Sequence, residues 1–292
     1  ERDSWERVAA RIGEERDAAR NTRDAAFADL VALRSLLREA MGRDIAGRLA
    51  QASAMAGGSA NAAQREALIE LLESWLQWWR DALDGIYAGQ PRQHEVAFAL
   101  SETVRIHALP RAELDALIDA RESDLDEVPF KDVTALEAYA NATAGGAQRL
   151  ALRILGGGAT HEPVVADAAT AYALLGTLRA FPFWAARGRV ALPVDLLEGW
   201  SASGSQLLSD EGAPIRRATA KHLLDVAARY FSQAESRPFP RRAMAAILPM
   251  AETGKSLRRL AAVNFDPVTD AFSVPRVARQ AAMLRAYVLG HL

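Results

Sequence analysis

The amino-acid sequence predicts an all-α protein, and three observations support this fold class. Apolar residues recur at steps of three and four along most of the 292-residue chain, which is the spacing of one face of an α-helix. Clusters of proline and glycine separate these periodic segments, at positions where helices begin and end. No segment of any length alternates apolar and polar residues as a half-buried strand does. Half of the residues are hydrophobic, so a sizeable core is expected.

The first sixty residues are expected to form a divergent N-terminal helical arm. An apolar helical stripe runs from Phe27 to Leu49, and such a stripe can pack inward or seat a partner helix. We expect it to contact a partner through Phe27, Leu30, Leu33, Leu37 and Met41. A run of small residues from Ala52 to Ala63 predicts a loop after the arm.

Seven further helices are predicted from the apolar periodicity and its proline and glycine boundaries. They cover residues 64–87, 95–108, 110–125, 133–155, 163–179, 214–234 and 275–289. Gly145 and Gly146 are expected to weaken or break the fourth of them. Residues 240–262 predict one more helix, with a kink at Pro249. The motif from Glu252 to Ser256 ends in Gly-Lys-Ser, but it lacks the first glycine and the preceding strand of a phosphate loop and is predicted to be a turn.

Composition excludes several classes of function. The chain has 35 basic and 37 acidic residues and a net charge of −2, which gives no general field to attract nucleic acid. Cysteine is absent, so disulfides and thiolate metal sites are excluded. The five histidines lie far apart without the spacing of a zinc site. No metal and no cofactor is therefore expected. The apolar window of residues 164–186 is interrupted by Asp167, Arg179 and Pro182, which argues against a membrane span.

Three blocks of sequence carry a resemblance to a known family. They are LQWWRDALDGIYAG (Leu76 to Gly89), the segment from Leu109 to Gly156, and LRAFPFWAARGRVALPVDLL (Leu178 to Leu197). Together with the C-terminal segment from Val274 to Leu292, they resemble the squalene and phytoene synthase family. The similarity is greatest to its alphaproteobacterial and mitochondrial branch, which includes an assembly factor of respiratory complex I. The resemblance implies an isoprenoid-synthase-like helical bundle over residues 61–292, with residues 1–60 as the divergent arm.

The resemblance also implies where a metal site would lie. Active members of the family hold magnesium against prenyl diphosphates between two acidic helices, one of which carries Asn, Asp and Asp at i, i+4 and i+8 before an RGR element. Counting back from Arg187-Gly188-Arg189 places these ligands at Gly176, Ala180 and Trp184. None of the three can bind a metal, and magnesium is the main stabiliser of a departing diphosphate. The site is therefore expected to be degenerate, with Arg187 and Arg189 left either to bind an anion or to hold the end of a helix.

The expected function is that of a catalytically inactive protein with the prenyl-synthase fold, which binds protein partners in a larger complex through its arm. The resemblance implies a respiratory complex and complex I assembly; a permanent subunit and an assembly factor both remain open. The first alternative is a prenyl-diphosphate-binding transferase with a site rebuilt from Glu66, Glu70, Asp119, Asp124 and the two arginines. The second alternative is a lipid carrier.

The resemblance further implies a location. The expected one is mitochondrial, on the matrix side and associated with the inner membrane from its surface; the alternative is the cytoplasm of an alphaproteobacterium. The chain starts at Glu1 rather than at a methionine, so a preceding N-terminal piece is expected; a targeting peptide is one candidate for it, and the sequence leaves its nature open.

Overall fold

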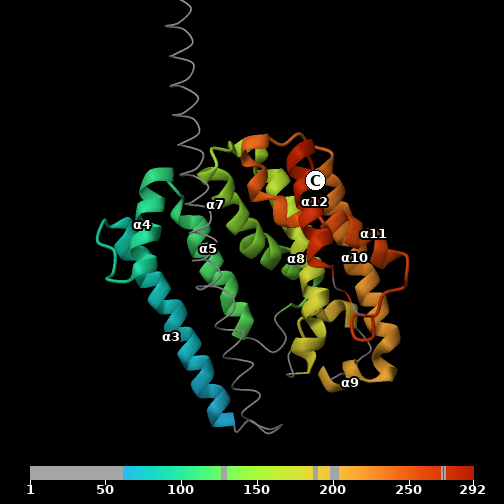
Figure 1. Cartoon of the computed structure of the whole chain (residues 1–292). Helices are drawn as coiled ribbons and strands as arrows, with labels where there is room; N and C mark the ends of the chain where they lie inside the picture. The colour runs from blue at the N-terminus through green and yellow to red at the C-terminus, as the bar shows by residue number, and fades with distance from the viewer. Residues whose placement is uncertain (1–61, 126–129, 187–189, 198–203, 271, 273) are drawn as a thin grey trace, which may run out of the picture.

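The computed structural model describes residues 62–125, 130–186, 190–197, 204–270, 272 and 274–292 (Figure 1). These residues form ten α-helices joined by short 3₁₀ turns, and no strand occurs among them. The all-α prediction is thereby confirmed for the part of the chain that is described. The expected arm over residues 1–60, with its stripe from Phe27 to Met41, lies outside the described residues.

The helices follow the proline and glycine boundaries of the sequence closely. They are α3 (Ala62–Tyr87), α4 (Glu95–His107), α5 (Arg111–Glu122), α6 (Val133–Ala140), α7 (Gly146–Ile154), α8 (Glu162–Ala185), α9 (Gly204–Leu208), α10 (Ala213–Glu235), α11 (Thr253–Ala261) and α12 (Arg276–Leu289). Figure 1 shows α3 and α4 on one side of the molecule and α10, α11 and α12 on the other, with α8 between them.

Helix α8 is the central helix of the core. It packs against α10, α7 and α6, and eleven of its residues are buried, among them Leu174, Leu178 and Phe181. These three positions lie within about 60° of one another around a helix of 3.6 residues per turn. Burying a large apolar side chain contributes roughly 1.5–3 kcal/mol, so this face of α8 supplies much of the stability of the bundle.

By length and composition alone, α8 is also the one helix among the described residues that could cross a membrane. More than half of its apolar window is buried inside the protein, however. The apolar residues of this helix thus contribute to the core of the protein.

The helix expected to break at Gly145 and Gly146 continues through both of them. Helices α6 and α7 are joined by a single π-helical turn, Asn141–Gly145. Such a turn is commonly an insertion of one residue that widens the helix locally. Arg149 holds this turn in place: its guanidinium donates to Asn141 Oδ1 at 2.6 Å and makes two bonds to Glu113 on α5, at 2.8 and 2.9 Å.

The single helix predicted over residues 240–262 is wrong. The structure has a 3₁₀ helix, Arg241–Ala246, a second 3₁₀ turn, Leu248–Met250, and then α11. Pro249 lacks the N–H that would continue a helix through this point, and Met244, Ile247 and Met250 are buried in the core. The Gly-Lys-Ser motif is not a turn either, because Thr253 starts α11 and the motif lies in its first turns.

A buried ion pair fastens the C-terminal part of the chain to α10. Arg216, in the first turns of α10, donates two hydrogen bonds to Asp266, at 2.9 and 2.8 Å. The same guanidinium donates to the carbonyl oxygens of Leu207 and Ser209, at 2.5 and 2.6 Å. Asp266 also accepts from the backbone N–H of Val268 at 2.9 Å. Each charge is thus surrounded by several partners, which a buried ion pair needs in order to offset its desolvation.

Candidate functional site

The three positions that the resemblance assigns to metal ligands lie on one strip of α8. Gly176, Ala180 and Trp184 are four residues apart and all half-buried, whereas Leu174 and Phe181 lie on the core side of the same helix. The spacing therefore places them as expected relative to one another. No oxygen or nitrogen ligand for magnesium is available in the glycine or alanine side chain, and the indole N–H of Trp184 is a donor only.

The two carboxylates of α8 lie elsewhere on the helix and are already engaged. Glu162 accepts from Arg153 at 2.6 Å, and Asp167 accepts from Arg237 at 2.6 Å. Burial raises the pKa of Asp167 above its ordinary value, although the hydrogen bond and charge of Arg237 act in the opposite direction. Both pairs join α8 to neighbouring segments and leave the strip from Gly176 to Trp184 without an acid.

The end of α8 presents aromatic surface. Phe183 and Trp184 meet edge to face, with ring centroids 5.0 Å apart, and Phe183 is exposed. Phe181 is fully buried and belongs to the core rather than to this cluster. Arg179, one turn before, lies over the ring of Phe272 at 6.0 Å. Arg187 and Arg189 lie outside the described residues, so their expected anion binding stays a prediction.

Those carboxylates of the proposed rebuilt site that the structure describes do not converge. Asp119 accepts from Arg80 at 3.0 Å, and Asp124 accepts from Arg121 at 2.8 Å and from the hydroxyl of Tyr139 at 2.9 Å. Glu70 is exposed on α3, and the side chain of Glu66 lies outside what the structure describes. Among the described residues, no group of three or more histidine, aspartate or glutamate side chains is arranged to hold a metal ion.

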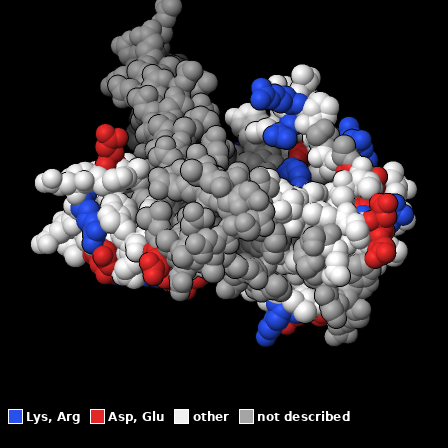
Figure 2. All heavy atoms as spheres, turned by 90° about the horizontal axis from the view of Figure 1, so that it is seen from below, with Lys and Arg blue, Asp and Glu red and all other residues white. Residues whose placement is uncertain are grey.

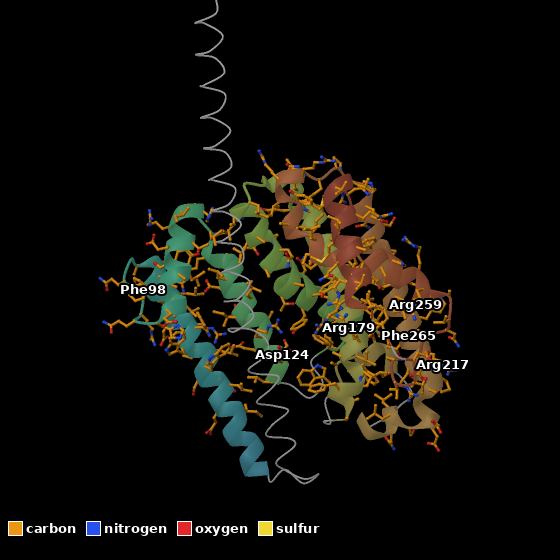
Figure 3. The ribbon with its side chains drawn as sticks, viewed as in Figure 1. Phe98, Asp124, Arg179, Arg217, Arg259 and Phe265 are labelled. Atoms are coloured by element: carbon orange, nitrogen blue, oxygen red, sulfur yellow. The ribbon has the colours of Figure 1, made fainter. Side chains whose placement is uncertain are left out.

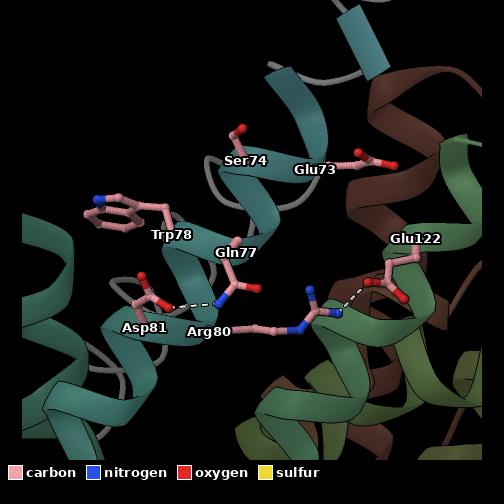
Figure 4. A pocket seen from close by; sticks show the side chains of 7 residues that line it. All are labelled: Glu73, Ser74, Gln77, Trp78, Arg80, Asp81 and Glu122. Atoms are coloured by element: carbon pink, nitrogen blue, oxygen red, sulfur yellow. Dashed lines mark hydrogen bonds and ion pairs between the residues drawn. The ribbon is translucent and has the colours of Figure 1, made fainter. Parts of the chain in front are cut away.

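An open groove between α3 and α5 is the concave surface next to these acids (Figure 4). It has a volume of about 580 Å³ and is lined by Glu73, Ser74, Gln77, Trp78, Arg80, Asp81 and Glu122. Arg80 reaches across the groove and donates to Glu122 at 2.5 Å. Three acidic side chains against one arginine give the groove a net negative charge, which disfavours a diphosphate and favours a basic or neutral ligand.

Aromatic side chains stiffen one wall of this groove. Trp78 meets Trp79 edge to face at 4.9 Å and His94 at 5.0 Å. Arg92 lies over the Trp78 ring at 5.7 Å and also donates to Asp81 at 2.8 Å. In the sequence, the block LQWWRDAL carried only a family resemblance. Its partners Arg92 and His94 lie in the loop before α4, with His94 as the N-cap, and periodicity cannot place a loop.

The charged side chains show no single dominant field on the face of the molecule seen from below. Lysines and arginines are interspersed there with aspartates and glutamates (Figure 2). This agrees with the net charge of −2 and leaves local surfaces, rather than an overall potential, as the means of recognition.

Comparison with known proteins shows the family to which the chain is related. The family model for squalene/phytoene synthase matches residues 28–282. The NADH dehydrogenase (ubiquinone) complex I assembly factor 6 of Bos taurus is 29% identical over 201 residues, which are 65% of this chain and 58% of that protein. The presqualene diphosphate synthase of Rhodopseudomonas palustris is 30% identical over 142 residues, 47% of this chain and 50% of that enzyme.

The structural comparison agrees on the fold. The crystal structure of squalene synthase HpnC from Alicyclobacillus acidocaldarius superposes with a TM-score of 0.54 and 18% identity, covering 83% of this chain and 97% of that one. At this level of identity the likeness concerns the fold, which is the isoprenoid-synthase-like bundle that was expected. The chain spans just under three fifths of the length of the mammalian assembly factor that it matches.

Proposed function

The chain belongs to the squalene/phytoene synthase family, and we propose that within it this protein is an assembly factor of a respiratory complex that binds protein and does not transfer prenyl groups. The observation that carries the proposal is the strip Gly176, Ala180 and Trp184 on α8, which offers no magnesium ligand at the three family positions. The proposed setting is mitochondrial, following the relatives named as complex I assembly factors.

Two further features support binding of protein over binding of a prenyl diphosphate. The groove between α3 and α5 is net acidic, so it would repel a diphosphate in the absence of metal. The acids that a rebuilt site would need are held by arginines of the protein itself, as with Asp119 and Arg80. The mammalian assembly factors match 65% of this chain, whereas the presqualene diphosphate synthase matches 47% and the 15-cis-phytoene synthase 55%.

The arm over residues 1–60 is proposed as the element that contacts the larger assembly. Its stripe from Phe27 to Met41 has the spacing of a helix that docks its apolar face onto another helix. The family match covers residues 28–282, so it includes residues 28–60 of the proposed arm as well as the bundle.

The decisive experiment combines loss of the gene with rescue. Cells of the source organism that lack the protein should accumulate less assembled NADH dehydrogenase complex on native gels, and the full chain should restore it. A variant with Glu70→Gln and Asp119→Asn should restore it equally, since both acids are exposed and have no catalytic part in this proposal. Normal complex levels without the protein would refute the assembly role.

A binding measurement separates the proposal from the transferase alternative. Calorimetric titration with farnesyl diphosphate, with and without magnesium, should give no heat of binding. Magnesium-dependent binding that the Glu70→Gln, Asp119→Asn variant loses would instead establish a rebuilt catalytic site.

Affinity purification with residues 1–60 present and deleted tests the arm. Equal recovery of complex subunits from both forms would refute its role.

A further inference from the structure

The C-terminal helix α12 carries an apolar stripe that faces away from the protein. Val277, Leu284 and Val288 are 76%, 64% and 56% exposed, and with Ala281 they follow one another at steps of four, three and four. The inner face of α12 is defined by Ala286, which is buried, and by contacts to the 3₁₀ helices Arg241–Ala246 and Leu248–Met250. The stripe is thus nearly opposite the side on which the helix is fastened.

The helix is held firmly enough to present this stripe. Gly290 adopts φ = +79° at its C-terminal end, and its N–H closes the last turn on Ala286. Arg241 donates to the carbonyl oxygen of Val288 at 2.5 Å, which satisfies a carbonyl that the end of a helix otherwise leaves without a partner. The exposed apolar residues therefore belong to a capped, docked helix rather than to a frayed end.

Basic residues flank the stripe, and no acidic residue accompanies them. At 100° per residue, Arg276 and Arg285 lie on either side of the stripe. Arg279 lies on the same side of the helix as Ala286, and Arg242 comes from the 3₁₀ helix that α12 packs against. All four are exposed, and none forms an ion pair within the described part of the chain. Residues 237–292 contain nine basic and three acidic residues, a balance of +6, whereas the whole chain has −2.

The three acids of this segment do not compensate its charge at α12. Glu252 and Asp266 are buried, Asp266 is paired with Arg216, and Asp270 accepts from the backbone N–H of Asp266. After residue 270 the chain has no acid at all. The surface is therefore apolar along the stripe and positive on both of its sides.

We propose that α12 docks onto the surface of a lipid bilayer that contains anionic headgroups. A helix lying in the headgroup region buries its apolar stripe in the acyl boundary while arginines at its sides reach the phosphates. Tyr287 and Leu289 are 53% and 50% exposed. Tyr287 suits a helix in the headgroup region, since tyrosine favours the interface between lipid and water. Charge complementarity selects this occupant: two arginines beside the stripe, Arg276 and Arg285, on a helix without acids match a dense anionic surface that needs no particular arrangement of acids.

Sedimentation with lipid vesicles tests the proposal using the full chain alone. The protein should bind vesicles of phosphatidylcholine mixed with phosphatidylglycerol, bind vesicles of pure phosphatidylcholine far more weakly, and be released as ionic strength rises. Because only lipid and this chain are present, the result is independent of the proposed assembly role. Absence of binding to the anionic vesicles would overturn the proposal.

Paired variants locate the surface. Val277→Asp with Leu284→Asp should weaken binding to anionic vesicles by at least about tenfold, because both apolar side chains leave the interface. The control is Phe98→Asp with Ile106→Asp on α4. Both are exposed apolar residues, and Phe98 lies on the opposite side of the molecule from α12 (Figure 3). Equal loss in both variants, or loss in neither, would refute docking through α12.

A second pair tests the charge. Replacing Arg276 and Arg285 with glutamine should weaken binding to anionic vesicles by roughly fivefold for each arginine. Replacing the exposed residues Arg105 and Arg229 with glutamine removes the same net charge from other surfaces and should change binding little. If the α12 variants bind vesicles like the parent but lose a protein partner in pull-downs, the stripe is a protein interface and the bilayer proposal is wrong.

Discussion

Arg216 and Asp266 lie 50 residues apart in the chain and form a two-point ion pair in which the side chains are 1% and 0% exposed. The pair joins α10 to the segment before α12, and the remaining N–H of the arginine holds the turn that precedes α10. It therefore ties three segments together at one buried point.

Breaking this pair should be costly. Arg216→Met leaves the carboxylate of Asp266 buried without its main partner, and we expect the free energy of unfolding to fall by about 3–5 kcal/mol. Arg217→Gln is the matched control, since Arg217 is 44% exposed and its Nε lies 3.8 Å from the same carboxylate; it should cost less than about 1 kcal/mol. Urea denaturation measures both. A similar cost for the two variants would contradict the importance of burial.

The same pair predicts acid sensitivity. Burial raises the pKa of Asp266, but the hydrogen bonds from Arg216 and Val268 and the charge of Arg216 outweigh this, and the net pKa lies below its ordinary value. A carboxyl with a lowered folded-state pKa contributes stability that is present above its unfolded pKa of about 3.9 and is lost as the pH falls through the folded value. Stability should therefore drop below about pH 4.

The measurement is the urea midpoint at a series of pH values from neutral to acid. A double variant, Arg216→Met with Asp266→Leu, replaces the pair by apolar side chains that the buried site can accept. It should show a shallower decline in acid than the parent chain. An identical acid slope in the two proteins would mean that other carboxyls, and not Asp266, control the transition.

Two glycines within helical segments should respond to alanine in opposite directions. A Cβ at Gly145 would lie 2.8 Å from Asn141 Oδ1 and 3.0 Å from Arg149 Nη1, so Gly145→Ala should disturb the π turn and cost about 1 kcal/mol despite the better helix propensity of alanine. A Cβ at Gly176 would have Arg179 Nη2 as its nearest atom, 3.9 Å away. Gly176→Ala should therefore raise the free energy of unfolding by about 0.5–1 kcal/mol. Thermal unfolding of both variants decides; the same sign for both would contradict this account.

The hydroxyl of Tyr87 should lose its proton at a higher pH than that of an ordinary tyrosine. Its hydroxyl donates to the carbonyl oxygen of Leu109 at 2.8 Å, and burial together with the negative charge of Asp115 raises its pKa to about 12, against a smaller lowering by Arg111. Its contribution to stability is present below the unfolded pKa of about 10 and is lost as the pH rises through about 12. Ultraviolet titration of tyrosinate should lose its component near pH 12 in Tyr87→Phe. Persistence of that component would assign it to another tyrosine.

Much of the helical layout could be predicted from the sequence, because proline and glycine mark the ends of most helices. The boundaries of α4 and α12 agree with the prediction to within one residue. The π turn could not be predicted: Arg149 of α7 donates to its Asn141 and is itself held by Glu113 from another helix, and two glycines in a row otherwise indicate a break. Pro249 indicated a kink, but residues 241–250, with Met244 and Met250 buried, form 3₁₀ turns, and only Thr253–Ala261 is α-helical.

The candidate site was predictable only where it depends on spacing along one helix. Steps of four place Gly176, Ala180 and Trp184 on one strip without any knowledge of the fold. The pairing of Arg80 with Asp119 and Glu122 spans about forty residues, and no local pattern carries that information. The acidic run before residue 125 therefore looked like a possible ligand set, although the structure ties its members to arginines.

Helix α8 carries its core residues and the strip of family ligand positions on different sides. Leu174, Leu178 and Phe181 fix how the bundle is assembled, while the strip from Gly176 to Trp184 lies more than a quarter turn away and takes little part in that assembly. Replacements on the strip can therefore alter reactivity while the architecture is inherited unchanged. In such a helix the fold can persist when the residues of a site change, and a different binding surface can arise at a distant end of the molecule.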